Sequence, residues 1–229
     1  MSRASLVALR LDPRWLAFAR RGPSPRAFYG PARGERYVEY ATKELSPETW
    51  PDFERFFARG TGWAFCACML YQRGCHLPKA AYPNREAMRI QNQAEKRAQV
   101  NDGRAHGILV YDDGEPIGWC QFGSAEELPL PGDGRRDRRI PPLGDGVRWR
   151  ITCFVTAVRR RRRGVASTAL RAALDAIRES GGGLVEAYPT VTPQDGNWAH
   201  AGTIPLFERE GFTVASRPNA PYVVMQRDV

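Results

Sequence analysis

A run of five arginines, residues 159–163, separates two apolar segments whose periodicities differ. Residues 149–155, before the run, are mainly apolar or β-branched, which is typical of a buried strand. Residues 164–180, after it, carry an apolar stripe at helical spacing, formed by Val165, Ala169, Leu170, Ala173, Leu174 and Ile177. The chain is therefore predicted to leave a strand, pass through a short basic turn and enter a helix.

A helix that begins at small residues after a basic turn has the chemistry of a phosphate site. The first N–H groups of a helix lack partners inside the helix, and the helix dipole places partial positive charge there. A phosphate can approach this backbone where side chains are small, as at Gly164 and Ala166, and arginines attract it further. The segment predicts a diphosphate-binding turn. A solvated charge patch and an RNA contact are the alternatives, and the position between strand and helix favours phosphate.

The rest of the chain predicts a single α/β domain. The segments 60–83 and 124–146 are irregular, and the helix beginning at Arg85 is polar enough to lie on the surface. The other predicted helices begin at Ser46 and Thr203, and the other predicted strands are residues 37–42, 108–111, 116–122, 184–188, 213–216 and 222–226. This order of hairpins and one strand–helix–strand crossover predicts a mixed sheet of about seven strands with helices on both faces.

The net charge of +9 is concentrated at the N-terminus. Residues 1–34 hold seven arginines and one aspartate, so the predicted domain, residues 35–229, is only mildly basic. We therefore do not expect a nucleic-acid partner, although an Arg-rich extension is compatible with a weakly ordered arm, a packed extra element, or a targeting or binding arm. No apolar run has the roughly 20 residues of a membrane span, so we expect no membrane partner.

Five cysteines do not make a secreted disulfide framework in a chain of this size, and an odd number favours free thiols in the cytoplasm. Cys66, Cys68, Cys75 and His76 are four potential zinc ligands, but Cys66 and Cys68 are separated by one residue only. We therefore expect no metal, and we interpret this aromatic-rich segment as an insert packed near the acceptor site. Cys153 is most simply a small buried apolar residue.

The motif Arg161-x-x-Gly164-x-Ala166 resembles the signature of the GNAT superfamily of acyl-CoA N-acyltransferases. Residues 202–212, ending in Gly211-Phe212, are similar to the second signature of that family, a short helix before a final hairpin. The similarity extends over residues 37–227, and the Cys-bearing insert resembles a poorly characterised bacterial subgroup. The resemblance implies a splayed sheet in which residues 149–155 and 184–188 part, with the thioester of acetyl-CoA reaching between them.

The resemblance also implies the cofactor contacts. The strand ending at Val155 is expected to bind the pantetheine arm, and the turn is expected to hold the pyrophosphate. The implied cofactor-binding residues are Phe154, Val155, Arg160, Arg161, Arg162, Arg163, Gly164, Val165, Ala166, Ser167 and Phe207. An amine of a small molecule or peptide would attack the acetyl carbonyl directly in a ternary complex. A homodimer is left open.

The acid and base of the reaction are less clearly marked. Residues 151–155 lack the carboxylate that many members carry there, and Phe207 stands where many have a tyrosine. We therefore predict Glu186, Tyr188 and His200 as catalytic residues, with Asp195 or water as alternatives. Each has a structural interpretation too: Glu186 as a surface residue, Tyr188 as core and His200 as a loop hydrogen-bonder. The alternative functions are an acyl-CoA-binding regulatory module and a nucleic-acid-binding protein.

Overall fold

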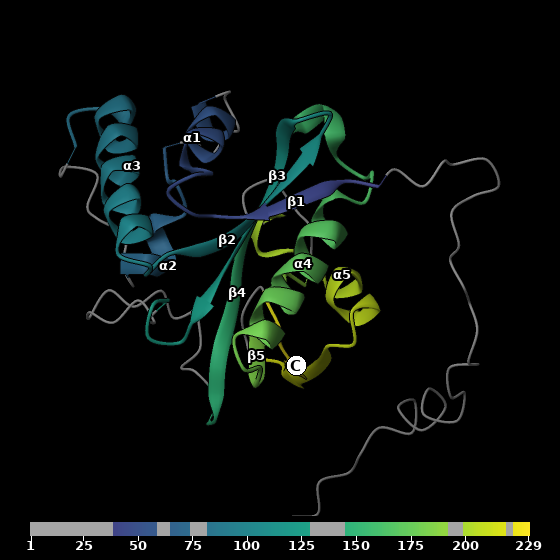
Figure 1. The fold of residues 1–229 in the computed structure, drawn as a ribbon. Coiled ribbons are helices and arrows are strands. Elements are labelled where there is room, and N and C mark those ends of the chain that lie inside the picture. The colour runs from purple at the N-terminus through teal and green to yellow at the C-terminus, as the bar shows by residue number, and fades with distance from the viewer. Residues whose placement is uncertain (1–38, 59–64, 74–81, 129–144, 192–198, 219–221) are drawn as a thin grey trace, which may run out of the picture. The chain divides into compact units, whose positions relative to one another are not determined.

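The computed structural model describes residues 39–58, 65–73, 82–128, 145–191, 199–218 and 222–229. The predicted N-terminal extension therefore lies outside the described residues. Within these ranges, seven strands form one mixed sheet in the order β1-β2-β3-β4-β5-β7-β6 (Figure 1). This confirms the predicted α/β class and the predicted number of strands. None of the described helices is long and apolar enough to span a membrane.

The sheet is antiparallel except at one place. An antiparallel meander comprises β1 (Ala41–Glu44), β2 (His106–Asp112), β3 (Glu115–Ser124) and β4 (Val147–Thr156). After β4 the chain crosses through α4 (Val165–Glu179) and returns as β5 (Leu184–Ala187), which pairs parallel to β4. The other half of the sheet is completed by β7 (Val224–Asp228), antiparallel to β5, and by β6 (Thr213–Ser216), which pairs with β7. The predicted crossover thus lies at the centre of the sheet.

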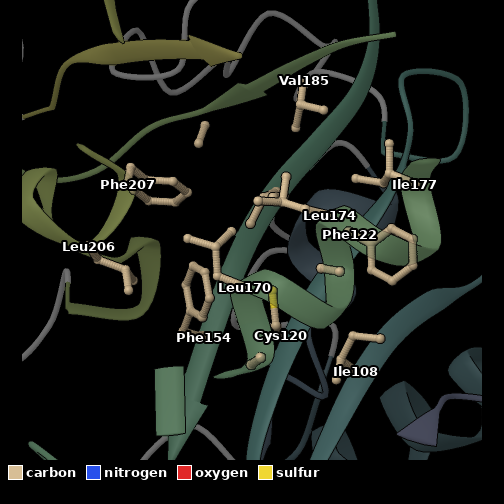
Figure 2. Packing of buried hydrophobic residues seen from close by; sticks show 14 of the residues in the cluster. Ile108, Cys120, Phe122, Phe154, Leu170, Leu174, Ile177, Val185, Leu206 and Phe207 are labelled. Atoms are coloured by element: carbon tan, nitrogen blue, oxygen red, sulfur yellow. The ribbon is translucent and has the colours of Figure 1, made fainter. Parts of the chain in front are cut away.

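Helices cover both faces of the sheet, as predicted. On one face, α4 and the short helix α5 (Ile204–Arg209) pack in a cluster that includes Phe122, Phe154 and Leu170 (Figure 2). On the other face, α1 (Trp50–Ala58) packs in a second cluster, where the rings of Phe53 and Trp119 meet edge to face with centroids 4.9 Å apart. Alternation along the strands divides the side chains between the two clusters.

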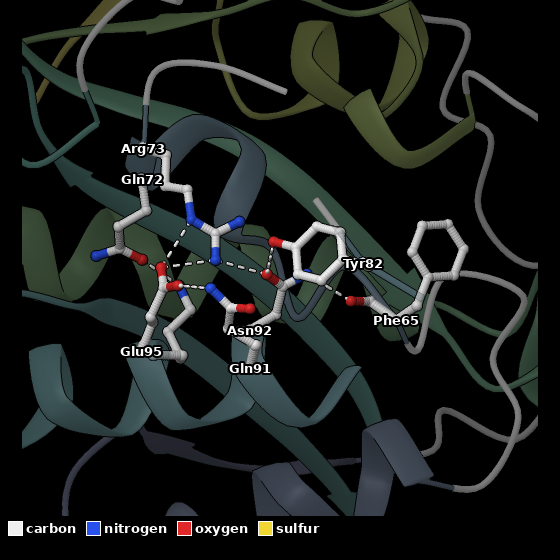
Figure 3. Close-up of polar contacts among 8 residues, drawn as sticks. Phe65, Gln72, Arg73, Tyr82, Gln91, Asn92 and Glu95 are labelled. Atoms are coloured by element: carbon white, nitrogen blue, oxygen red, sulfur yellow. Dashed lines mark hydrogen bonds and ion pairs between the residues drawn. The ribbon is translucent and has the colours of Figure 1, made fainter. Parts of the chain in front are cut away.

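One helix lies where the sequence predicts irregular structure. α2 (Met69–Arg73) packs beside α3 (Arg85–Asn101), and Arg73 contributes one hydrogen bond to Glu95 at 2.7 Å and another to Asn92 at 2.6 Å (Figure 3). Five residues are too short to show a helical period, so the prediction for this part of residues 60–83 was wrong. α3 was predicted correctly, but its polar composition conceals one fully buried residue, Lys96.

Two elements, β1 and α1, begin about four residues later than predicted. β1 begins at Ala41 rather than at residue 37, and its four side chains are all exposed, so alternation there carries no core signal. α1 begins at Trp50 rather than near Ser46. The residues between form a turn in which the Ser46 amide donates to Thr49 Oγ1 at 2.8 Å and the Thr49 hydroxyl donates to the Glu44 carbonyl at 2.7 Å. Local side-chain hydrogen bonds therefore replace the first predicted helical turn.

The start of α4 is held close to the sheet by the missing side chain of Gly118. A Cβ at Gly118 in β3 would lie 2.3 Å from Cγ1 of Val165, the first residue of α4. Because heavy atoms do not approach so closely, the glycine fixes how near the helix start comes to β3. The basic turn that precedes Val165 is thereby fixed against the same strand.

We expect Gly118→Ala to lower the free energy of unfolding by about 1–3 kcal/mol, as overpacking of a core does. Chemical denaturation followed by circular dichroism measures this change. In a Val165→Ala background, which lacks the opposing methyl, the penalty should be smaller. An equal penalty in both backgrounds would show that the two residues do not limit each other.

Candidate functional site

β4 and β5 part from each other in the middle of the sheet. Their pairing ends at Ile151 and Ala187, whereas β4 continues to Thr156 beside β3 alone in the described sheet. Beyond β5, Thr190 forms isolated bridges with Thr203 and Tyr222 and does not pair with β4. The strands therefore splay, as the family resemblance implies, and one edge of β4 has no partner strand among the described residues.

A β-bulge lies where the splay begins. Phe122 pairs with Ile151 and Gln121 pairs with Cys153, so Thr152 is an extra residue without an opposite number in β3. Its hydroxyl donates to Gln121 Oε1 at 3.0 Å. Bulges re-aim backbone groups, and this one turns the backbone of β4 at the point where β5 leaves it.

The turn after β4 presents open backbone donors. Gly164 precedes α4 with a φ of 85°, and no side chain caps the helix. The first helical bond is donated by the Thr168 amide to the Gly164 carbonyl at 2.9 Å. The amides of Val165, Ala166 and Ser167 therefore have no acceptor within the helix. A Cβ at Gly164 would meet nothing within 4 Å, so there is room beside the turn for an anion.

The arginines of the turn divide into two groups. Arg160, in a short 3-10 turn (Val158–Arg160), is half-buried, and its Nη1 lies 2.6 Å from Asp112 Oδ2 at the end of β2. The other four arginines of the run, Arg159, Arg161, Arg162 and Arg163, are exposed. Arg160 therefore anchors the turn to the β2–β3 hairpin, and the four exposed arginines direct their charge to solvent; Arg161, Arg162 and Arg163 directly precede the helix start.

The apolar side chains that were predicted to contact the cofactor are buried in the two cores. Phe154 faces the α4 cluster and Val155 the α1 cluster, and both are buried. Phe207 is fully buried, with its ring centroid 5.9 Å from that of Phe154 and 5.0 Å from that of Phe212. In this structure the Phe207 ring packs α5 against the sheet, and its predicted contact with a cofactor stays a prediction.

Glu186 and Tyr188 are brought together at the end of β5. Both are buried on the face opposite α4, as alternation along β5 predicts, and Glu186 is not a surface residue. The Tyr188 hydroxyl donates to Glu186 Oε1, and Gln226 donates to Glu186 Oε2 at 2.7 Å. Burial raises the pKa of Tyr188 well above its ordinary value, and the neighbouring Glu186 carboxylate raises it further against the opposing effect of Arg150. The hydroxyl therefore stays protonated at neutral pH.

Arg150 is a member of this cluster that sequence reasoning missed. It stands opposite Glu186 in the β4–β5 register and is fully buried. Its guanidinium lies 4.9 Å from the centroid of the Tyr188 ring, and its Nη1 donates to the Leu128 carbonyl at 2.6 Å. Its Nε and Nη2 find no hydrogen-bond partner among the described residues. The position of Arg150 inside the apolar segment 149–155 was the available signal, since a buried guanidinium is costly unless it has an acceptor.

His200 and the potential metal ligands complete the set. His200 is half-exposed on the short turn Ala199–Ala201, which packs against β4, and Asp195 lies outside the described residues. No group of three or more His, Cys, Asp or Glu side chains that could hold a metal ion occurs within the described ranges. Cys75 and His76 lie outside those ranges, so the expected absence of metal stays a prediction.

Comparison with known proteins names the family. A model of the acetyltransferase (GNAT) family matches residues 44–212, so the chain belongs to the GNAT family of acetyltransferases. No curated protein matches the chain significantly.

Solved structures similar to this chain share little sequence with it. They include the PaiA N-acetyltransferase of Thermoplasma acidophilum in complex with coenzyme A, at 11% identity and a TM-score of 0.49, covering 84% of this chain and 100% of that one. An acetyltransferase of Thermus thermophilus has 14% identity and a TM-score of 0.45, with 85% and 100% covered. The N-acetyltransferase YhbS of Escherichia coli in complex with CoA has 14% identity and a TM-score of 0.46, with 86% and 85% covered.

Proposed function

We propose that this protein transfers an acetyl group from acetyl-CoA to the amine of a small molecule or peptide by direct attack in a ternary complex. The observation that carries the proposal is the turn before α4, where uncapped backbone amides at Val165–Ser167 lie beside open space at Gly164. Membership of the acetyltransferase family supports the choice of donor. We assign this activity to residues 35–229 and assign no role in it to the N-terminal extension, residues 1–34.

The residues present fit acetyl-CoA at two places. The amides at the start of α4, together with Arg161, Arg162 and Arg163, are suited to the pyrophosphate. The edge of β4 that lacks a partner strand among the described residues, at Phe154 and Val155, offers backbone groups to the amide-bearing pantetheine arm. Acetyl-CoA supplies the acetyl group as a thioester, which an amine can attack without an acyl-enzyme.

The buried carboxylate gives the site a proton acceptor. During transfer the amine nitrogen bonds to the carbonyl carbon, the C–S bond breaks, and one proton must leave the nitrogen. We assign Glu186 as the acceptor of that proton, directly or through water, because it is the buried carboxylate on the strand that borders the splay. Tyr188, protonated and hydrogen-bonded to Glu186, is the assigned proton donor to the departing thiolate. His200 remains a third candidate.

Arg150 indicates which amines suit the site. A guanidinium with two unused donor atoms binds a carboxylate well, since its fork matches two oxygens. Glu186 stands opposite it in the β4–β5 register, so one positive and one negative group lie side by side on the same face. We therefore propose an acceptor that carries a carboxylate near its amine, with the carboxylate held by Arg150 and the amine near Glu186.

The cofactor site is tested by Gly164→Glu compared with Gly164→Ala. Both variants carry the strain of a side chain at positive φ, about 1–2 kcal/mol. The glutamate adds bulk and negative charge where the pyrophosphate is expected. Calorimetry should therefore find acetyl-CoA affinity lost in Gly164→Glu and largely kept in Gly164→Ala. Affinity near that of the wild type in a folded Gly164→Glu protein would remove the assignment.

The proton acceptor is tested by Glu186→Gln. Turnover at neutral pH should fall by about 10²–10⁴-fold, as expected when a positioned base is lost, and should recover in part at high pH, where the amine is already neutral. Acetyl-CoA affinity should barely change. Glu208→Gln removes the same charge from an exposed position and is the matched control. Full turnover of Glu186→Gln across the pH range would make water the proton acceptor.

The acceptor class is tested with a panel of amino acids as acceptors. Each amino acid is compared with its amide, which has the same amine but lacks the carboxylate. Arg150→Gln should raise KM for the amino acids by about 10–100-fold, the equivalent of one charge-assisted hydrogen bond, and should leave KM for the amides nearly unchanged. Arg148→Gln, on the exposed part of the same strand, is the control. An equal change for both members of a pair would contradict the assignment of Arg150, and no acetylation of any amine would contradict acetyl transfer itself.

A further inference from the structure

Two buried cysteines from distant parts of the chain lie in direct contact. Cys68, just before α2, donates a hydrogen bond to the sulfur of Cys153 in β4, at an Sγ–Sγ distance of 3.2 Å. The indole N–H of Trp119 donates to Cys68 Sγ, at 3.2 Å. All three side chains are buried. A thiol sulfur is a weak acceptor, whereas a thiolate is a strong one. Ionisation of Cys68 would therefore reverse the bond between the two sulfurs, so that Cys153 and Trp119 both donate to the Cys68 thiolate.

A buried cation lies nearby. Lys96 in α3 is fully buried, and its ammonium group donates to Gln72 Oε1. Among the described residues no carboxylate forms an ion pair with it. Burial lowers the pKa of Lys96 to about 8, while the negative charge of nearby thiolates, Cys68 first, opposes that decrease. A buried ammonium is stabilised by a nearby anion, and a thiolate at Cys68 would provide one.

The same charge acts on Cys68. Burial alone raises the pKa of this thiol, but the hydrogen bond from Cys153, the charge of Lys96 and the hydrogen bond from Trp119 together bring it below its ordinary value. By contrast, the pKa of Cys153 is raised well above its ordinary value, first by its hydrogen bond to Cys68. The pair therefore consists of one acidified sulfur and one protonated partner in contact with it.

The backbone around Cys68 is held in an unusual conformation. Ala67 and Cys68 have φ values of 45° and 53°, in the left-handed region that residues other than glycine seldom adopt. Gln121 donates to the Cys68 carbonyl at 2.9 Å, and Asn92 donates to the Phe65 carbonyl at 2.6 Å (Figure 3). Contacts from the sheet and from α3 thus support a strained segment that directs the Cys68 sulfur at Cys153.

We propose that Cys68 and Cys153 form an oxidisable thiol pair whose substrate is a small hydroperoxide. The Cys68 thiolate attacks one peroxide oxygen, the O–O bond breaks, and the other oxygen leaves as hydroxide or alkoxide and takes up a proton. Cys68 is then a sulfenic acid. The sulfur of Cys153 attacks it, the S–O bond breaks, and water leaves with the proton of Cys153. Two thiols and one hydroperoxide thus give one disulfide, one alcohol or water, and one further water.

The position of the pair connects it to the splay. Cys153 directly follows Thr152, the bulged residue of β4, and Gln121 bonds both the Thr152 hydroxyl and the Cys68 carbonyl. A disulfide would tie the segment before α2 to β4 beside the point where β5 leaves it. The oxidation chemistry itself needs no acetyl-CoA, so it stands independently of the proposed acetyl transfer.

The test is peptide mapping of the full-length folded protein after hydrogen peroxide treatment and alkylation of the remaining thiols. The expected result is a loss of two hydrogens per chain, with a disulfide joining the peptides that carry Cys68 and Cys153. In the Cys153→Ser variant, oxidation should stop at a Cys68 sulfenic acid, which dimedone traps. Lys96→Met should slow oxidation by about tenfold, the change in thiolate fraction for one pKa unit. Cys120→Ser, which removes a buried thiol of the opposite face, should behave as the wild type.

Three results would overturn the proposal. The first is a disulfide through Cys75 or between two chains in place of the Cys68–Cys153 bond. The second is equally fast loss of two hydrogens in Cys68→Ser. The third is a folded wild-type protein that resists peroxide while the same protein unfolded in urea is fully oxidised. Because the wild-type peptide map decides between the first and expected results, a variant that fails to fold does not remove the test.

Discussion

The short parallel pairing of β4 with β5 is the constraint on which the rest of the structure depends. It joins two antiparallel halves of the sheet, and it ends at Ile151 and Ala187 while β4 continues for another five residues. Backbone N–H and C=O groups in a sheet are normally hydrogen-bonded, so the groups of β4 that β5 leaves unpaired need another partner. Here the interruption leaves one edge of β4 open directly before the turn that begins α4. The open edge and the uncapped helix start are therefore consecutive in the chain and adjacent in space.

The two faces of the sheet serve different purposes. The α4 face is packed with apolar side chains and holds the turn in place through Val165, whereas the opposite face buries polar and charged groups beside the same strands. Glu186 and Arg150 lie at the end of this face near β5. Lys96, in α3, donates a hydrogen bond to Gln72 of α2. Burying charged groups destabilises a fold unless they are paired or have a ligand. Their concentration on one face is the physical reason for assigning both the acceptor site and the thiol pair to it.

Much of the fold was predictable because it is encoded by local patterns. The bounds predicted for α4, β5 and β6 agree with the structure within about one residue, since each has a clear period and a clear stop such as the three glycines after α4. α2 was not predicted, because it is too short to show a period and is held by contacts with α3. Arg150 was not recognised as buried, although it lies within an apolar strand, and Lys96 was not recognised because it lies in a helix of polar composition.

The sequence by itself determined the order of the strands and the longer helices, the α/β class and the family, because hydrophobic periodicity and the turn before α4 are written in consecutive residues. It also placed Glu186 and Tyr188 on one face through simple alternation along β5. Only the tertiary structure decided what those residues meet: Arg150 beside Glu186, Gln226 bonded to it, and Cys68 in contact with Cys153 across 85 positions of the chain. Such contacts depend on strand register and on helix packing. Both are set by the burial of many side chains together, which no local stretch of sequence contains.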